Sequence, residues 1–262
     1  MEKDQFDNYS YDPDMFQNDD VRSSELYGHG SDYTGFGADT FGEVRELLQQ
    51  EVISKSFLYL MAGLGVTAVA AFAAPTVMAG WLMRGQYNYI LLFVAELAIV
   101  IVSNIAISEN NVALSAVLFT LYSYITGSLL GIIFWAYELT SVGTVFLMTA
   151  LMFGIMAVFG MVTKRDLSSI GNICLMGLIG IIIATLVNVL FIRNGMFDLI
   201  VSVIGIGIFV ALTAYDMQKI KRRVAYSNGE NAQVLALSGA FELYLDFVNI
   251  FLRLLRLFGK RK

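Results

Sequence analysis

Residues 171–215 read GNICLMGLIGIIIATLVNVLFIRNGMFDLIVSVIGIGIFVALTAY, two long apolar runs separated by the polar break Arg193-Asn-Gly. Each run is close to the length of about 20 residues that an α-helix needs to cross the hydrocarbon core of a bilayer. Because the break is so short, two helices formed by these runs must be antiparallel neighbours. This stretch predicts an all-α integral membrane fold.

Further apolar runs of similar length lie on both sides of this stretch. Short polar breaks such as Glu109-Asn-Asn and Lys164-Arg-Asp separate them. We expect six spans near 57–81, 88–107, 112–137, 141–162, 171–193 and 197–215, followed by a seventh apolar segment at 232–258. Residues 46–262 are therefore predicted to form one seven-helix transmembrane domain.

Composition agrees with a membrane protein. Of the 262 residues, 57% are apolar and 15% are charged, whereas a soluble domain has about 45–50% apolar and 25% charged residues. The single cysteine, Cys174, excludes a disulfide framework and a cysteine metal cluster. The single histidine, His29, lies outside every apolar run, which excludes zinc-protease and histidine-relay chemistry within the membrane.

The net charge of −5 combines two unlike parts of the chain. Residues 1–55 carry 13 acidic and 4 basic residues, whereas residues 56–262 carry 9 acidic and 13 basic residues. The N-terminal part is rich in Asp, Ser, Gly and Asn and has no helical or strand periodicity, a composition that cannot bury enough apolar area to order itself. Residues 1–45 are predicted to be a disordered acidic tail, either a solvated extension or a handle for a partner.

Basic residues predict the orientation in the membrane. With the N-terminus in the cytoplasm, the inside segments carry ten Lys and Arg residues and the outside loops carry two, as the positive-inside rule requires. The run Lys219–Arg223 is interpreted as part of this signal, not as a nucleic-acid patch. A spanning last helix would place Lys260-Arg-Lys262 outside, against the rule, so a spanning and a re-entrant last helix both remain open.

The segment 232–258 carries its polar residues in one narrow stripe. Their spacing of four and three residues puts them on one face of an α-helix, and they are Glu242, Asp246, Asn249, Arg253 and Arg256. Two structures fit this pattern. The helix lies at the membrane interface with its stripe in water, or it stands inside the bundle with its stripe against other polar groups.

Three carboxylates fall within apolar segments, where an ionisable group is costly and is a functional candidate by default. Glu96 lies in the middle of the second span, Asp216 ends the sixth span in TAYDMQKI, and Asp246 lies midway along the striped segment in LYLDFVNIF. Each also has a structural interpretation: Glu96 as a hydrogen-bonded acid inside the bundle, Asp216 as a partner of the following cations, and Asp246 as an exposed residue of an interfacial helix.

A meeting of Asp216 and Asp246 would make a proton-sensitive latch. Two like charges about 3 Å apart do not both ionise readily, so the two groups would share a proton and titrate as a unit. Glu242, one turn before Asp246, could extend the same polar path. It also lies near a helix start, where the helix dipole favours acids.

The chain resembles a bacterial-type member of the transmembrane Bax inhibitor motif family. The resemblance rests on the segments YDMQKIK at 215–221 and LYLDFVNIFLRLLRLFG at 243–259, and on the hydrophobic pattern of residues 50–262. The resemblance implies two three-helix layers around a central C-terminal helix. It also implies that Asp216 and Asp246 form a pH-sensitive pair that gates a calcium leak, and that Glu96 is the acidic residue of helix two. The stretch IAISENN at 105–111 lacks the basic residues that some relatives carry there, so the aspartate pair would form the latch alone.

The leading functional hypothesis is thus a pH-sensitive calcium, or cation, leak channel in a bacterial plasma membrane, without enzymatic activity or a cofactor. Calcium prefers six to eight oxygen ligands, which Glu96, Asp216, Asp246 and Asn249 do not supply as a tight site, so we expect only transient binding during permeation. An intramembrane aspartyl protease is disfavoured because the chain has LYLD instead of GxGD and no PAL motif. The alternative is a regulator that binds another membrane protein, such as an ATP-dependent membrane protease.

Overall fold

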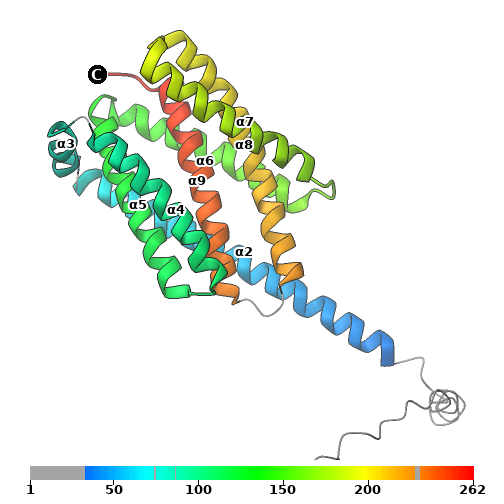
Figure 1. Ribbon diagram of the computed structural model, residues 1–262. Helices are drawn as coiled ribbons and strands as arrows, with labels where there is room; N and C mark the ends of the chain where they lie inside the picture. The colour runs from blue at the N-terminus through cyan, green and yellow to red at the C-terminus, as the bar shows by residue number, and fades with distance from the viewer. Residues whose placement is uncertain (1–32, 74, 86, 228–230) are drawn as a thin grey trace, which may run out of the picture. The chain divides into compact units, whose positions relative to one another are not determined.

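The computed structural model describes residues 33–73, 75–85, 87–227 and 231–262 (Figure 1). In this part of the chain the elements are helical and no strand is formed. In chain order they are α2 (Tyr33–Ala73), α3 (Pro75–Met83), α4 (Asn88–Ser108), α5 (Val112–Trp135), α6 (Leu139–Val162), α7 (Ser168–Val187), the short π-helix η2 (Asn188–Ile192), α8 (Gly195–Tyr226) and α9 (Ala232–Phe258). The all-α fold class is confirmed.

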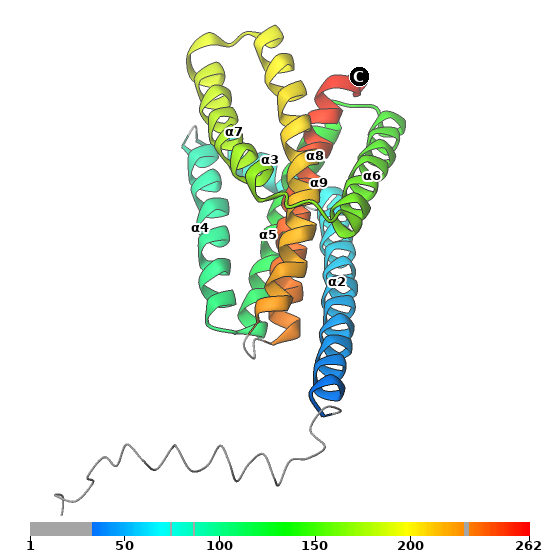
Figure 2. The same ribbon diagram turned by 90° about the vertical axis from the view of Figure 1, so that its right-hand side faces the viewer.

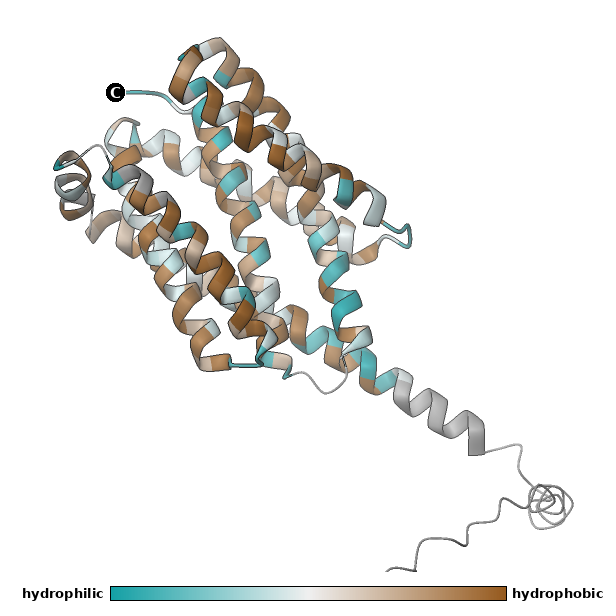
Figure 3. Cartoon of the chain, in the orientation of Figure 1, coloured by the Kyte–Doolittle hydropathy of each residue, from teal (hydrophilic) through white to brown (hydrophobic). Residues whose placement is uncertain are grey.

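Within the described residues, six helices are long and apolar enough to cross a membrane. They are α2, α5, α6, α7 with η2, α8 and α9, and they coincide with six of the seven predicted segments. The remaining prediction, 88–107, coincides with α4, whose stretch Val94–Ser108 is a shorter apolar helix. In Figure 3 much of the ribbon of these helices has the brown of hydrophobic residues, and many large hydrophobic side chains, such as Ile155, Ile173 and Val203, are exposed, as expected for helices that face lipid.

The first predicted span, 57–81, is divided in the structure. Helix α2 ends at Ala73 and α3 begins at Pro75. Proline has no backbone N–H and is favoured at the first position of a helix, where that N–H would lack a partner in any case. At its other end α2 extends back to Tyr33, so residues 33–45 of the predicted tail are helical, and residues 1–32 lie outside the described residues.

Helix α9 is the most buried membrane helix. In its most apolar 18-residue stretch 83% of the residues are buried, against 12 to 39% in the other five. It packs against α4, α5, α6 and α8, and Tyr244 of α9 also bonds to Thr67 of α2. The predicted central C-terminal helix is therefore observed, whereas its enclosure by two layers of three helices stays a prediction.

Helix α9 runs antiparallel to α8 along the length of the bundle (Figure 2). Residues beyond it return to the connection between α5 and α6: Lys260 O accepts from Glu138 N at 2.9 Å, and Lys262 N donates to Ala136 O at 3.0 Å. At the opposite end of α9, Asn231 N donates to Asn110 Oδ1 at 3.2 Å. The helix is thus continuous between the two ends of the unit Leu47–Lys262, which favours a spanning over a re-entrant last helix.

Candidate functional site at the α8–α9 interface

The polar stripe of α9 faces α8. Glu242 forms ion pairs with α8 near one end of the interface. Near the other end Arg256 pairs with Asp198 in the first turn of α8, and Arg253 donates to Val201 O at 3.3 Å and lies over the ring of Phe209. Of the two structures that fit the stripe, the one inside the bundle is observed.

The two predicted aspartates lie on facing helices in this interface. Asp216 of α8 is 9% exposed and Asp246 of α9 is 4% exposed. Their carboxyl groups are close enough for their charges to interact. Oδ2 of Asp246 is buried and has no hydrogen-bond partner among the described residues. Two carboxyl groups are therefore withdrawn from solvent together between membrane helices.

Glu242 links α9 to two cations of α8. Its Oε1 accepts from Lys219 Nζ at 2.8 Å and from Arg223 Nη2 at 2.7 Å, and a second nitrogen of Arg223 donates to Ser238 Oγ at 2.6 Å. Lys219 and Arg223 follow Asp216 by three and seven residues, so all three lie on one face of α8. The cations considered as partners of Asp216 are thus bonded to Glu242, one turn before Asp246.

The other two predicted path residues lie differently. Asn249 shares the stripe, but its amide donates to Leu245 O of its own helix at 2.8 Å. Glu96 lies beside Thr126 of α5 and near Tyr244 of α9, and its Oε1 is buried without a partner among the described residues. Tyr244 and Asp246 are two residues apart, which places them on nearly opposite faces of the helix. Glu96 therefore lies on a different side of α9 from the one that carries Asp246 and faces Asp216.

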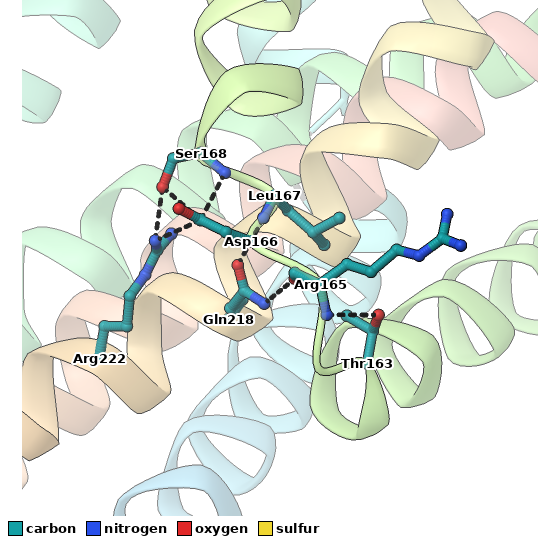
Figure 4. Close-up of polar contacts among 7 residues, drawn as sticks. All are labelled: Thr163, Arg165, Asp166, Leu167, Ser168, Gln218 and Arg222. Atoms are coloured by element: carbon teal, nitrogen blue, oxygen red, sulfur yellow. Dashed lines mark hydrogen bonds and ion pairs between the residues drawn. The ribbon is translucent and has the colours of Figure 1, made fainter.

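The outer face of α8 carries a second set of contacts, with the connection between α6 and α7 (Figure 4). Gln218 accepts from Leu167 N at 2.8 Å and donates to Arg165 O at 2.7 Å, and Lys221 donates to Met161 O at 2.8 Å. Arg222 donates to Asp166 Oδ1 at 2.9 Å. These contacts fasten the α6–α7 connection to the half of α8 that carries Asp216.

Asp166 also organises the start of α7. Its Oδ1 accepts from Ser168 N at 2.9 Å and from Ser168 Oγ at 2.7 Å. These hydrogen bonds, together with the charge of Arg222, hold the pKa of the Asp166 carboxyl below its ordinary value. The carboxylate form is therefore the one that the α6–α7 connection requires.

Interpreting the basic run of α8 as an orientation signal alone misses these contacts. Lys219 and Arg223 point to α9, Lys221 to the last turn of α6, and Arg222 to the α6–α7 connection. The spacing of Lys219 and Arg223 from Asp216 is a signal in the sequence that could have placed them on the aspartate face. Their partners, Glu242 and Ser238, could not be named without knowing that α9 is antiparallel to α8.

In the described part of the chain, no three carboxylate, imidazole or thiol side chains come together in a way that could hold a metal ion. What the arrangement offers is a pair of buried carboxyl groups next to a salt-bridged carboxylate and two cations. Such groups can gain and lose protons, and their repulsion can act on the packing of two helices.

Comparison with known proteins identifies the family. Residues 49–262 match the family described as inhibitor of apoptosis-promoting Bax1. The inner membrane protein YbhL of Escherichia coli K12 is 39% identical over 218 residues, which cover 81% of this chain and 93% of YbhL. The uncharacterized protein RP147 of Rickettsia prowazekii is 37% identical over 79% of this chain and 89% of its own length. An uncharacterized membrane protein of Streptococcus pyogenes serotype M1 is 40% identical over 64% of this chain and 72% of its own length. The chain is therefore a multi-pass membrane protein that belongs to the Bax inhibitor family, as its two aspartate motifs predict.

Proposed function

We propose that the protein is a pH-sensitive leak channel for calcium and related cations, gated by Asp216 and Asp246. The observation that carries the proposal is the burial of both carboxyl groups at the interface of two membrane helices. A single shared proton would let the pair stay together, because one negative charge in a site of low dielectric is tolerated better than two. Loss of the proton adds a repulsion between α8 and α9, which is the force that would open a path.

The cations of α8 give the gate a counter-charge. Lys219 and Arg223 lie on the same face of α8 as Asp216 and are paired with Glu242 of α9. Two positive charges face one ionised Glu242, so the first negative charge on the aspartate pair is balanced by these cations of α8. These two cations take the place of the basic residues that the stretch 105–111 lacks. Because the carboxylates do not form a tight metal site, we propose that calcium binds only transiently as it passes.

The proposal is tested by calcium flux into liposomes that hold the purified full chain and a trapped calcium indicator. We expect a flux that changes roughly tenfold between pH 6 and pH 8, as a step controlled by one proton allows. Asp216→Asn and Asp246→Asn should each remove the pH dependence, because an amide carries no titrating proton. Glu138→Gln, which removes an exposed charge outside the α8–α9 interface, serves as the control and should keep it.

Two results would overturn the proposal. One is the absence of any pH-dependent calcium flux from wild-type protein shown to be folded and inserted. The other is an unchanged pH profile in both aspartate variants.

The proposed orientation has a cytoplasmic N-terminus. The α6–α7 connection, which carries Lys164 and Arg165, is bonded to the basic end of α8 through Arg165 O and the Asp166 carboxylate, so the two basic segments face the same compartment. Single cysteines placed at Lys164 and at Glu138, in a Cys174→Ser background, should be labelled from opposite sides of the membrane by an impermeant maleimide. Labelling of both from one side would refute the topology.

A second candidate function is regulation of another membrane protein, such as an ATP-dependent membrane protease. It rests on the strongly acidic N-terminal segment, which holds 13 of the 22 acidic residues within residues 1–55. Deleting residues 1–32 removes no residue of the described helices. Loss of a co-purifying membrane protein with retained flux would assign recruitment to the tail, whereas loss of flux would tie the tail to transport.

A further inference from the structure

A groove opens on the side of the bundle between α2 and α6. It has a volume of about 380 Å³, within the range of about 300–1,000 Å³ that is usual for ligand pockets. Its floor is formed by α9, where Phe247 and Phe251 are each 4% exposed. At its mouth Phe72 is 72% exposed and Leu139 is 57% exposed. The groove therefore leads from the outer surface to the most buried helix.

The lining of the groove is apolar. Small residues on its two walls, Ala68 and Ala71 of α2 and Gly143 of α6, leave the space open, and a Cβ added at Gly143 would meet no atom within 4 Å. The hydroxyl of Thr67, the one hydroxyl among the described lining residues, is engaged with Gly63 O at 2.9 Å and with the hydroxyl of Tyr244 at 2.6 Å. An apolar space of this kind is not filled by water.

The helices that form the groove are membrane-spanning, so the medium at its mouth is the acyl-chain region of the bilayer. A basic segment lies near one end of the groove. Lys260 Nζ is 3.1 Å from Glu138 Oε1, and Lys260 N donates to Ser141 Oγ at 2.9 Å. Both partners, Glu138 and Ser141, belong to the start of α6, where Leu139 lies at the mouth of the groove, although neither of them lines the groove itself. Lys260, Arg261 and Lys262 are exposed and carry the charge that an anionic phospholipid headgroup requires.

The geometry points to a binding site for an anionic phospholipid, with one acyl chain in the groove between α2 and α6 and the headgroup at Lys260–Lys262. The chain would lie against Phe247 and Phe251, and Phe146, whose ring centroid is 5.3 Å from that of Phe247, would form the wall. This site is separate from the α8–α9 interface. It does not depend on whether the protein conducts ions.

The test uses the full chain in nanodiscs that contain phosphatidylglycerol with a photoreactive diazirine in one acyl chain. Adducts are mapped by mass spectrometry. We expect peptides of α2 and α6 that line the groove to be labelled roughly tenfold more than the outer face of α7. On that face Ile173 and Met176 are 69% and 73% exposed, so exposure to lipid alone predicts equal labelling of the two regions.

Two matched substitutions on α6 separate a bound chain from general exposure. Gly143→Leu fills the groove and should reduce groove labelling roughly tenfold. Gly154→Leu introduces the same side chain on the same helix, at a position that also has no atom within 4 Å of an added Cβ and does not line the groove. It should leave labelling unchanged. Ala68→Leu provides a second filling variant if Gly143→Leu does not fold.

The headgroup is tested with the same diazirine on phosphatidylcholine. Phosphatidylglycerol should label the groove roughly fivefold more, since each basic residue near an anionic lipid contributes about 1 kcal/mol. Changing Lys260, Arg261 and Lys262 together to Gln should remove the preference. Equal labelling of groove and α7, no effect of either filling variant, or equal labelling by the two lipids would each overturn the proposal.

Discussion

Glu242 is the residue that ties the two cations of α8 to α9. Its side chain is 20% exposed, and those of Lys219 and Arg223 are 33% and 32% exposed, between the extremes of an exposed pair and a fully buried one. Glu242→Gln would leave two partly buried cations without this carboxylate. We expect a loss of about 1 to 3 kcal/mol in the free energy of unfolding, measured by denaturation in detergent micelles.

The matched control is Glu138→Gln, which breaks an ion pair in which Glu138 is 37% exposed and Lys260 73% exposed. Water screens such a pair, so its loss should cost at most about 1 kcal/mol. Equal effects of the two substitutions would mean that the Glu242 contacts contribute no more than surface charges do.

Asp166 predicts a pH dependence in the acid range. Because hydrogen bonds from Ser168 and the charge of Arg222 lower its pKa in the folded protein, it stabilises the fold at pH values above the ordinary aspartate pKa of about 3.9. That contribution is lost as the pH falls through the lowered folded value. The melting temperature of wild type should therefore be higher than that of Asp166→Asn at pH 6, and the difference should shrink below about pH 4. A difference that stays constant between pH 6 and pH 3 would contradict this assignment.

At the scale of the elements, apolar run length predicts the helices well and their ends less well. The predicted span 112–137 corresponds to α5 (Val112–Trp135), and the predicted span 141–162 corresponds to α6 (Leu139–Val162), so their ends agree within two residues. The prediction 197–215 stops eleven residues short of the end of α8, because hydropathy ends where the charges begin. The helix continues through Lys219–Arg223 because partners on α9, at the end of α6 and on the α6–α7 connection satisfy those charges.

Close contact between α2 and α5 depends on Gly127. A Cβ added there would lie 2.8 Å from Thr67 Cα, so the backbones of the two helices would have to separate. Gly127→Ala should destabilise the protein by about 1 to 3 kcal/mol. Gly154→Ala, where no atom lies within 4 Å of the new Cβ, should be neutral or stabilising by up to about 1 kcal/mol because alanine favours the helix. Thermal unfolding of the two variants in the same detergent compares them, and an equal cost for both would rule out the steric explanation.

At the scale of the whole molecule, residue patterns predict which helices exist but not which side chains meet. The stripe on α9 shows that one face is polar, and it fits both a wet and a buried helix. Only the packing of α9 among α4, α5, α6 and α8 selects between them. In the same way, the sequence shows Asp246 and Glu96 alike as intramembrane acids. Only the packing shows that Glu96 faces a different side of α9 from the side on which Asp246 lies. Contacts between residues 23 positions apart or more, such as Lys219 with Glu242, depend on topology that local spacing does not contain.

The burial of Asp216 and Asp246 between α8 and α9 has a cost in stability. A carboxylate removed from water without full compensation destabilises a fold, so replacement by a neutral amide of similar shape removes that cost. Asp246, 4% exposed and with one oxygen lacking a partner among the described residues, is the sharper case. If the pair shares one proton in the folded protein and loses it on gating, the unfolded chain, whose aspartates ionise above about pH 4, is favoured increasingly as the pH rises. Asp246→Asn should then be more stable than wild type at pH 8, and the difference should shrink as the pH falls towards about 4, as measured by unfolding in micelles across this range. A variant that is less stable than wild type at pH 8 would show that the ionised pair holds the two helices together, and repulsion between the aspartates could not then open the channel.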